Sequence, residues 1–232
     1  MNIRGIYKTS LIDFPGKISS VLFTGGCNLR CGFCHNPHLV LEETGEDNYS
    51  NEEVFEFLHK RIGLIDGVTI SGGEPTLSKK LLPFVKELKN LSLAVKLDTN
   101  GFNPQAIHDL LKESLLDYVA VDIKTAPSRY KELTNSEADF SNIKETIEML
   151  KFAGIDYELR TTCIPGFISQ EEFEEIKNEL GEVQNYYLQQ FVSRVDLLDK
   201  KFEQLQPLSV NELRTLETYV KTFADYVEIR GI

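Results

Sequence analysis

The sequence lacks several features that would point to common classes of protein. Its 232 residues contain only four cysteines, too few for a disulfide-rich secreted scaffold. It has no apolar run near the ~20 residues that cross a bilayer, no signal-peptide pattern and no low-complexity tract. Its 25 basic residues face 36 acidic ones, and a net charge of −11 disfavours binding to nucleic acid. We therefore expect a soluble cytoplasmic protein with no nucleic-acid and no membrane partner.

Three of the four cysteines lie close together, at Cys27, Cys31 and Cys34, with the spacing C-x3-C-x2-C. A [4Fe–4S] cluster has four ligand positions, usually filled by cysteine thiolates, so three cysteines leave one iron open. An open iron can bind and activate a small molecule, which favours a reactive site over a passive electron relay. Structural zinc, with His35 or His38 as a further ligand, is the alternative. A disulfide is disfavoured because three cysteines this close pair badly.

The remaining sequence predicts alternating strands and helices. Short apolar runs predict six buried strands, at 18–24, 68–71, 93–97, 116–122, 156–162 and 185–191. Strands that alternate with helices imply a parallel sheet with right-handed crossovers. Because a closed eightfold barrel usually needs ~250 residues, we predict the α/β class, with a laterally open partial (β/α)6 barrel. We expect one domain over residues 1–232, ending in a helix at about 209–223.

Polar residues and proline indicate where some of the helices begin. Ser50 with Glu53 matches a capping box, and Ser141 is predicted to cap the helix that carries Ile143. Pro83 either kinks the helix predicted near residues 78–88 or delays its start.

The cysteine spacing, with Phe33 directly before the third cysteine, resembles the radical S-adenosylmethionine (SAM) superfamily. The continuation Cys34–Pro37 narrows this resemblance to enzymes that activate glycyl-radical enzymes. The segments Ser10–Lys17 and Phe23–Cys27 are most similar to activating proteins of anaerobic ribonucleoside-triphosphate reductase. The resemblance continues to about Phe191.

Pyruvate formate-lyase activating enzymes share much of this pattern, including Leu97–Gly101 and Asp122–Lys124. This sequence departs from them at Val192, where their pattern has a histidine. This departure makes the pyruvate formate-lyase activating enzymes a weaker match than the reductase activators.

The resemblance implies a SAM site beside the cysteines. Cys27, Cys31 and Cys34 would hold one [4Fe–4S] cluster whose open iron chelates SAM, with Phe33 near the adenine. Gly72 and Gly73 would let the backbone approach the ligand. The carboxylate of Glu74 would accept a hydrogen bond from SAM's amino group. The structural alternative is a strand-to-helix turn with an acidic residue at the helix N-terminus.

Later strand ends supply further candidates. By resemblance, Asp98, Thr99, Asp122 and Lys124 line the SAM pocket, and Arg160 reaches SAM's carboxylate or ribose. A structural ion pair is the alternative for Asp122, Lys124 and Arg160. Asp122 could also hold a monovalent cation. Cys163 stands alone in the sequence, and we expect it to be a small buried hydrophobe.

The resemblance also implies a reaction. Flavodoxin or ferredoxin would supply one electron, SAM would yield methionine and a 5′-deoxyadenosyl radical, and that radical would take a hydrogen atom from a glycine of the partner enzyme. Anaerobic ribonucleoside-triphosphate reductase is the expected partner. Pyruvate formate-lyase, another glycyl-radical enzyme and a small-molecule substrate are the alternatives.

Overall fold

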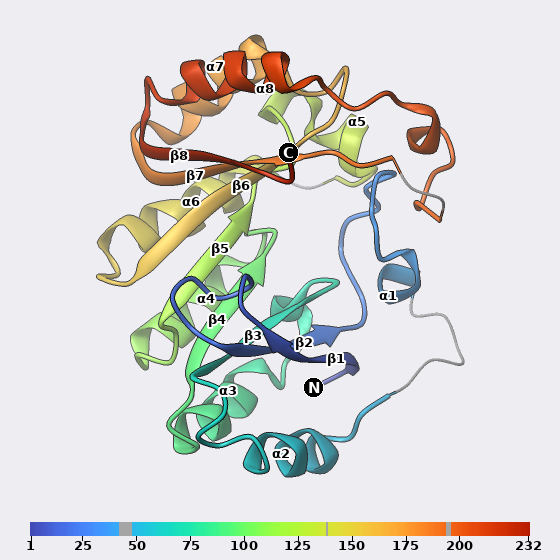
Figure 1. Cartoon of the computed structure of the whole chain (residues 1–232). Coiled ribbons are helices and arrows are strands. Elements are labelled where there is room, and N and C mark those ends of the chain that lie inside the picture. The colour runs from blue at the N-terminus through green and yellow to red at the C-terminus, as the bar shows by residue number, and fades with distance from the viewer. Residues whose placement is uncertain (42–47, 138, 194–195) are drawn as a thin grey trace. The chain divides into compact units, whose positions relative to one another are not determined.

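The structure, a computed structural model, describes residues 1–41, 48–137, 139–193 and 196–232. They form two compact units, each with its own strands and helices (Figure 1). Unit 1 consists of Met1–Asn28, His38–Thr99 and Asn103–Val119, and unit 2 of Leu29–Pro37, Asn100–Phe102 and Ala120–Ile232.

Unit 1 is built on four strands, of which the last three are parallel. They are β1 (Ile3–Ser10), β2 (Ser19–Thr24), β3 (Gly67–Gly72) and β4 (Ala94–Thr99). Its α-helices are α1 (Pro37–Leu41, whose first residue belongs to unit 2), α2 (Asn51–His59), α3 (Leu81–Asn90) and α4 (Pro104–Lys112). The label η marks a short 3₁₀ helix, here η1 (Pro75–Leu77). Leu22, Val68 and Ile70 are fully buried, as the continuous apolar runs of a covered parallel sheet require.

Unit 2 repeats the alternation of strands and helices. Its strands β6 (Asp156–Cys163), β7 (Val183–Gln190) and β8 (Ala224–Arg230) are parallel. Strand β5 (Tyr118–Asp122) ends in this unit, and the N–H of Ile123 donates to the carbonyl of Arg160 at 2.8 Å. The helices are η2 (Pro127–Arg129), α5 (Tyr130–Thr134), α6 (Phe140–Phe152), α7 (Gln170–Leu180), η3 (Phe202–Gln204) and α8 (Val210–Val220).

The strand predictions were accurate, and the helix starts were less so. All six predicted strands are present, and the capping box of Ser50 is confirmed. The prediction for Ser141 was wrong, because Asp139 caps α6 by accepting a hydrogen bond from the Ser141 N–H at 2.9 Å. Helix α3 starts late, which leaves Pro83 in its first turn, where a missing N–H costs little. The last helix ends at Val220, three residues before the predicted end.

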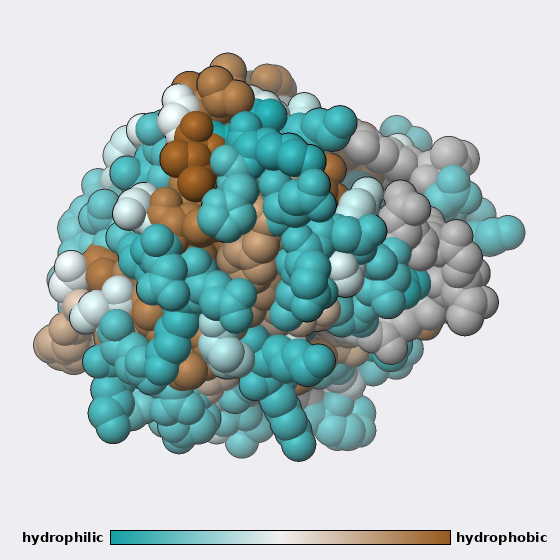
Figure 2. Space-filling model, turned by 90° about the horizontal axis from the view of Figure 1, so that it is seen from below, coloured by the Kyte–Doolittle hydropathy of each residue, from teal (hydrophilic) through white to brown (hydrophobic). Residues whose placement is uncertain are grey.

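Hydrophilic side chains predominate on the face shown in Figure 2, where hydrophobic ones appear in small groups. Some large apolar side chains are nevertheless exposed, among them Ile12 and Phe152 at 86% and 85%. No helix within the described residues has the length and apolar character needed to cross a membrane.

The buried strands of unit 1 should carry much of its stability. We expect Ile70→Ala to lower the free energy of unfolding by about 2–5 kcal/mol, because it removes buried methyl groups and leaves a cavity. Urea unfolding followed by circular dichroism measures the change. Ile12→Ala is the matched control, and its effect should stay within about 0.5 kcal/mol. Equal losses in the two variants would contradict the burial of Ile70.

Candidate functional site

Two glycine-rich turns meet at the carboxyl ends of β2 and β3 in unit 1. The N–H of Gly73 donates to the carbonyl of Thr24 at 2.8 Å, and the N–H of Glu74 donates to that of Gly26 at 2.7 Å. A Cβ atom on Gly73 would lie 2.0 Å from the Gly26 oxygen, so no side chain fits there. The structure therefore holds the predicted Gly72–Glu74 motif against the residue that precedes Cys27.

The carboxylate of Glu74 is fixed in place by its own neighbours. Glu74 is 2% exposed, and its Oε1 accepts hydrogen bonds from the backbone N–H of Thr76 at 3.0 Å and from the hydroxyl of Thr99 at 2.8 Å. The Thr76 hydroxyl is a third donor. Glu74 is thus the N-cap of η1, as the structural alternative predicted. The same bonds orient a buried anion that could accept a hydrogen bond from an ammonium group.

Asp98 and Thr99 of β4 have different partners. The carboxylate of Asp98 forms a buried ion pair with the Nζ of Lys96 at 2.7 Å, and Lys96 is 2% exposed. Thr99, the next residue along the strand, instead contacts Glu74. Neighbouring residues of a strand point to opposite faces, which explains why Asp98 and Thr99 have different partners. Asp98 thus forms an ion pair with Lys96, a residue that was not predicted from the sequence.

Unit 2 holds the second half of the cysteine loop. The N–H of Cys34 donates to the carbonyl of Cys31 at 3.0 Å, which closes a tight turn. The N–H of Arg30 donates to the carbonyl of Thr134 at 2.8 Å and ties the loop to the end of α5. Cys31 is buried and Cys34 is half-buried. Phe33 is 5% exposed and therefore buried.

The chemistry of the cysteines fits a cluster. None of the four cysteines, all within the described residues, forms a disulfide, so the thiols of Cys27, Cys31 and Cys34 remain for binding to a cluster. Among the described residues, no three Cys, His, Asp or Glu side chains gather around one point as the ligands of a single metal ion do. A four-iron cluster takes each of its cysteine ligands on a separate iron.

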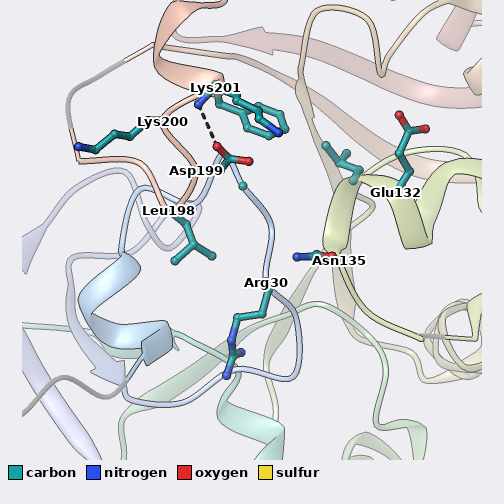
Figure 3. A pocket seen from close by; sticks show the side chains of 10 residues that line it. Arg30, Glu132, Asn135, Leu198, Asp199, Lys200 and Lys201 are labelled. Atoms are coloured by element: carbon teal, nitrogen blue, oxygen red, sulfur yellow. Dashed lines mark hydrogen bonds between the residues drawn. The ribbon is translucent and has the colours of Figure 1, made fainter.

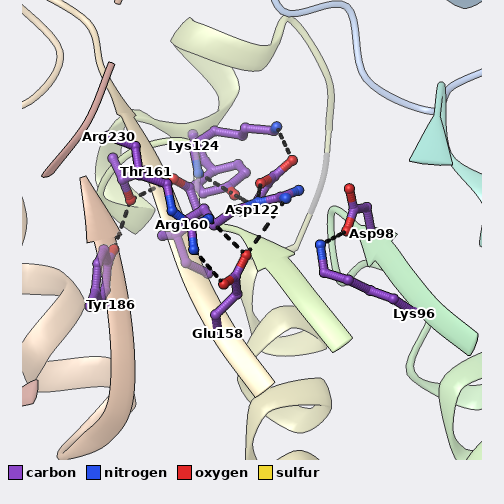
Figure 4. A network of polar contacts seen from close by, with 11 residues as sticks. Lys96, Asp98, Asp122, Lys124, Glu158, Arg160, Thr161, Tyr186 and Arg230 are labelled. Carbon is purple, nitrogen blue, oxygen red and sulfur yellow. Dashed lines mark hydrogen bonds and ion pairs between the residues drawn. The ribbon is translucent and has the colours of Figure 1, made fainter. Parts of the chain in front are cut away.

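The structure brings the three later charged candidates together in unit 2 (Figure 4). Asp122 accepts hydrogen bonds from the Nε of Arg160 at 2.7 Å and from the Nζ of Lys124 at 3.1 Å. Burial alone would raise the pKa of the Asp122 carboxyl, but Arg160 and then Lys124 hold that pKa well below its usual range. The ion pairs that the structural alternative predicted for Asp122, Lys124 and Arg160 are therefore present. A monovalent cation beside Asp122 stays a prediction, and it would add a third positive charge to this carboxylate.

Lys124 also links this network to the cysteine loop. Burial lowers the pKa of its ammonium group, but the charge of Asp122 and then that of Cys31 outweigh the burial and raise it. The backbone N–H of Lys124 donates to the hydroxyl of Tyr130 at 2.9 Å. The end of β5 and the second cysteine thus lie within electrostatic range of each other.

Two further members of this network, Glu158 and Arg230, were not predicted from the sequence. Arg230 donates from both terminal nitrogens to the fully buried carboxylate of Glu158, at 3.1 and 3.0 Å. The guanidinium of Arg160 lies 3.8 Å from the same carboxylate. Glu158 and Arg160 are two residues apart on β6 and therefore share a face, a signal that could have identified Glu158. No local pattern indicates Arg230, which is 72 residues away.

Cys163 has the buried position that we predicted. It is 0% exposed, and its Sγ lies 3.8 Å from the carbonyl of Thr161. Burial raises the pKa of its thiol to about 12. The thiol therefore stays protonated at neutral pH, unlike the thiolate that ligates iron.

The comparisons with known proteins show the family of the chain. The model of the radical SAM superfamily matches residues 21–180, more than half of the chain. The class of protein is thereby defined as radical SAM, and members of this superfamily use a [4Fe–4S] cluster and SAM.

Two relatives extend over nearly the whole chain. A candidate glycyl-radical enzyme activating enzyme of Methanocaldococcus jannaschii is 37% identical, over 99% of this chain and 96% of its own length. The pyruvate formate-lyase-activating enzyme of Clostridium pasteurianum is 27% identical, over 94% of this chain and 96% of its own length. The chain belongs to the glycyl-radical-enzyme activating family of the radical SAM superfamily.

A solved structure shows the same fold. SuiB of Streptococcus suis bound to S-adenosylmethionine gives a TM-score of 0.67 at 15% identity over 88% of this chain. This chain spans about half of SuiB, 48% of its length. At 15% identity, the similarity supports the fold only. The predicted fold class, an α/β partial barrel of the radical SAM type, is confirmed.

The contact between the two glycine turns can be tested with one methyl group. We expect Gly73→Ala to lower the free energy of unfolding by about 1–3 kcal/mol, because the new Cβ overlaps a backbone oxygen that cannot move alone. Chemical denaturation measures the loss. Gly5→Ala is the matched control, because its Cβ would meet Phe23 at 3.5 Å, an ordinary contact. A Gly73→Ala protein as stable as the control would refute the contact.

The raised pKa of Cys163 predicts a difference in thiol reactivity. In the folded, metal-free protein at mildly alkaline pH, iodoacetamide should modify Cys27 and Cys34 long before Cys163, which is buried and whose pKa is raised to about 12. Peptide mapping by mass spectrometry follows each site. Unfolding in urea should bring the rate of Cys163 up to that of the others. Similar rates for Cys163 and Cys34 in the folded protein would be inconsistent with the structure.

Proposed function

We propose that this chain is the activating enzyme of a glycyl-radical enzyme and that Cys27, Cys31 and Cys34 are the ligands of its one cluster. When bound, the cluster and SAM supply a one-electron cleavage that yields methionine and a 5′-deoxyadenosyl radical. The observation that carries the proposal is the pair of backbone hydrogen bonds that hold Gly72–Glu74 beside Gly26, the residue before Cys27.

The residues around the cysteines have separate tasks in this proposal. Gly72 and Gly73 let SAM approach the backbone, and the fixed carboxylate of Glu74 accepts a hydrogen bond from the ammonium group of SAM. Thr99 keeps that carboxylate in place through its hydroxyl, which donates at 2.8 Å. Phe33 packs near the adenine.

The charged residues of the later strands are further proposed contacts of SAM. Asp98, which forms an ion pair with Lys96, is one of them. Arg160 and Lys124 are the cations available to the carboxylate or ribose of SAM. Asp122 holds both in position through bonds of 2.7 and 3.1 Å.

The substrate of the reaction is a protein. Reduced flavodoxin or ferredoxin gives one electron. One glycine of the substrate protein would lose its Cα hydrogen atom to the 5′-deoxyadenosyl radical, which would become 5′-deoxyadenosine and leave the unpaired electron on the glycine. Reduced donors and cysteine ligands require a reducing compartment, and we therefore place the protein in the cytoplasm.

The proposed partner is anaerobic ribonucleoside-triphosphate reductase. The segment Ser10–Lys17 and Val192 in place of histidine support this choice. Pyruvate formate-lyase is the second candidate, because an activating enzyme of that system matches 94% of this chain. A small-molecule substrate is the remaining alternative.

Iron content and SAM cleavage test the proposal directly. After anaerobic reconstitution, the wild-type protein should hold about four irons and four sulfides per chain and, once reduced with dithionite, should release 5′-deoxyadenosine from SAM. Cys31→Ala should lose both properties, because it removes a cluster ligand. Cys163→Ala is the matched control and should keep both.

The outcomes separate the alternatives. One zinc per chain without SAM cleavage would refute the proposal. If SAM is cleaved, each candidate partner is added in turn, and electron paramagnetic resonance looks for a glycyl radical. Formation of the radical on the reductase alone supports the first candidate, and formation on pyruvate formate-lyase alone supports the second.

A further inference from the structure

Gly32, which follows Cys31, has no room for a side chain, although its backbone conformation would allow one. Its backbone conformation is one that any residue can adopt, since its φ lies outside the left-handed region where glycine is favoured. A Cβ atom at this position would nevertheless lie 2.4 and 2.7 Å from two ring atoms of Phe202. The Cβ of Asp199, at 3.1 Å, would be a further tight contact. The ring of Phe202, and not the backbone, is therefore the main obstacle to a side chain at position 32.

Phe202 contacts both residues that separate Cys31 from Cys34. Its ring covers Gly32 and also meets the ring of Phe33, with 6.1 Å between the centroids and 54° between the planes. Asp199 ties the same segment to the loop, because its N–H donates to the carbonyl of Gly32 at 2.9 Å. The N–H of Phe202 in turn donates to the carbonyl of Asp199 at 3.0 Å.

The ring of Phe202 is itself supported. Phe167 stacks on it at 5.9 Å with 27° between the planes, and the guanidinium of Arg129 lies 4.5 Å from the centroid of Phe167. Ion pairs with Glu132 and Glu172, at 3.1 and 3.3 Å, hold Arg129. The stack thus presents Phe202 to the cysteine loop from a fixed position.

Phe202 lies where the loop borders open space. A cavity of about 670 Å³ is lined by Arg30 and Gly32 of the loop and by Leu198 and Asp199 of the segment that leads to Phe202 (Figure 3). A loop that contains glycine and faces a cavity has many conformations to lose when it binds a ligand. A rigid ring against Gly32 and Phe33 reduces that loss.

We propose that Phe202 is a positioning residue, which fixes the turn between Cys31 and Cys34 and the ring of Phe33 for binding of the cluster and SAM. The role in binding rests on the proposed function, whereas the effect on the turn does not. Side chains held in place by their neighbours lose less entropy when a ligand binds. A displacement of about 1 Å in a bound group can cost about 100-fold in rate.

The effect on the turn is tested in the metal-free protein. We expect Phe202→Ala to raise the iodoacetamide modification rate of Cys31 several-fold, because the turn that buries this thiol loosens. Phe152→Ala is the matched control, since that ring is 85% exposed, and it should leave the rate unchanged. Thermal unfolding by circular dichroism checks that each variant is folded, and Phe202→Leu replaces Phe202→Ala if that variant does not fold. Equal rates in folded variant and wild type would overturn the proposal.

The effect on the cofactors is tested by a rescue. Gly32→Ala should retain less iron after reconstitution and lower kcat/KM for SAM cleavage by about ten- to a hundredfold, because its Cβ displaces the turn from Phe202. Adding Phe202→Ala to this variant should restore part of the iron, since it makes room for the methyl group. A double variant no better than Gly32→Ala would overturn the proposed contact.

The two proposals fail in different ways. If wild-type protein binds neither cluster nor SAM, the proposed function fails, while the modification rate of Cys31 still decides whether Phe202 holds the turn. If wild type is active and the Phe202 variants match it in iron content, in KM for SAM and in the modification rate of Cys31, the positioning role alone fails.

Discussion

The backbone contact of Gly72–Glu74 with the end of β2 constrains the strand ends of unit 1. The N–H of Gly73 donates to the carbonyl of Thr24, the last residue of β2, at 2.8 Å, and the N–H of Glu74 donates to that of Gly26 at 2.7 Å. The approach leaves no space for a Cβ atom on Gly73. Because Glu74 follows directly, the same contact decides where its carboxylate lies, and Thr76 and Thr99 then fix the orientation. The position of Glu74 relative to the start of the cysteine loop is thus a property of the backbone.

Buried charge imposes a second constraint, in unit 2. Arg160 forms ion pairs with the carboxylates of Asp122 and Glu158, and Arg230 also pairs with Glu158. Burying ion pairs costs desolvation energy that their attraction only partly offsets, so such a network is weak evidence for stability. It does hold its members in one geometry, because removing any partner would leave an uncompensated buried charge. This geometry suits a pocket that must present cations in fixed directions to an anionic group.

The parts of the fold and site that were predicted depend on local sequence. The β strands follow from runs of apolar residues, and the glycine motif from three adjacent residues. Ser141 was mistaken for a cap because Asp139, an equally good cap, lies two residues earlier and the apolar period does not distinguish them. Lys96 was missed because a lysine in a buried strand looks like an exception until its partner Asp98 is seen. Arg230 and Phe202 act on residues far away in the sequence, and no local pattern carries that information.

The glycines near the cysteines show why residue type alone is an incomplete guide. Gly72 has a φ of +115°, which disfavours any side chain. Gly73 is excluded from having one by a main-chain oxygen, which every residue at position 26 would carry, so no neighbouring substitution removes the restriction. Gly32 is restricted by a ring that another residue could replace. The first two restrictions therefore belong to the architecture of the unit, whereas the third belongs to the particular side chain at position 202 and can change with it.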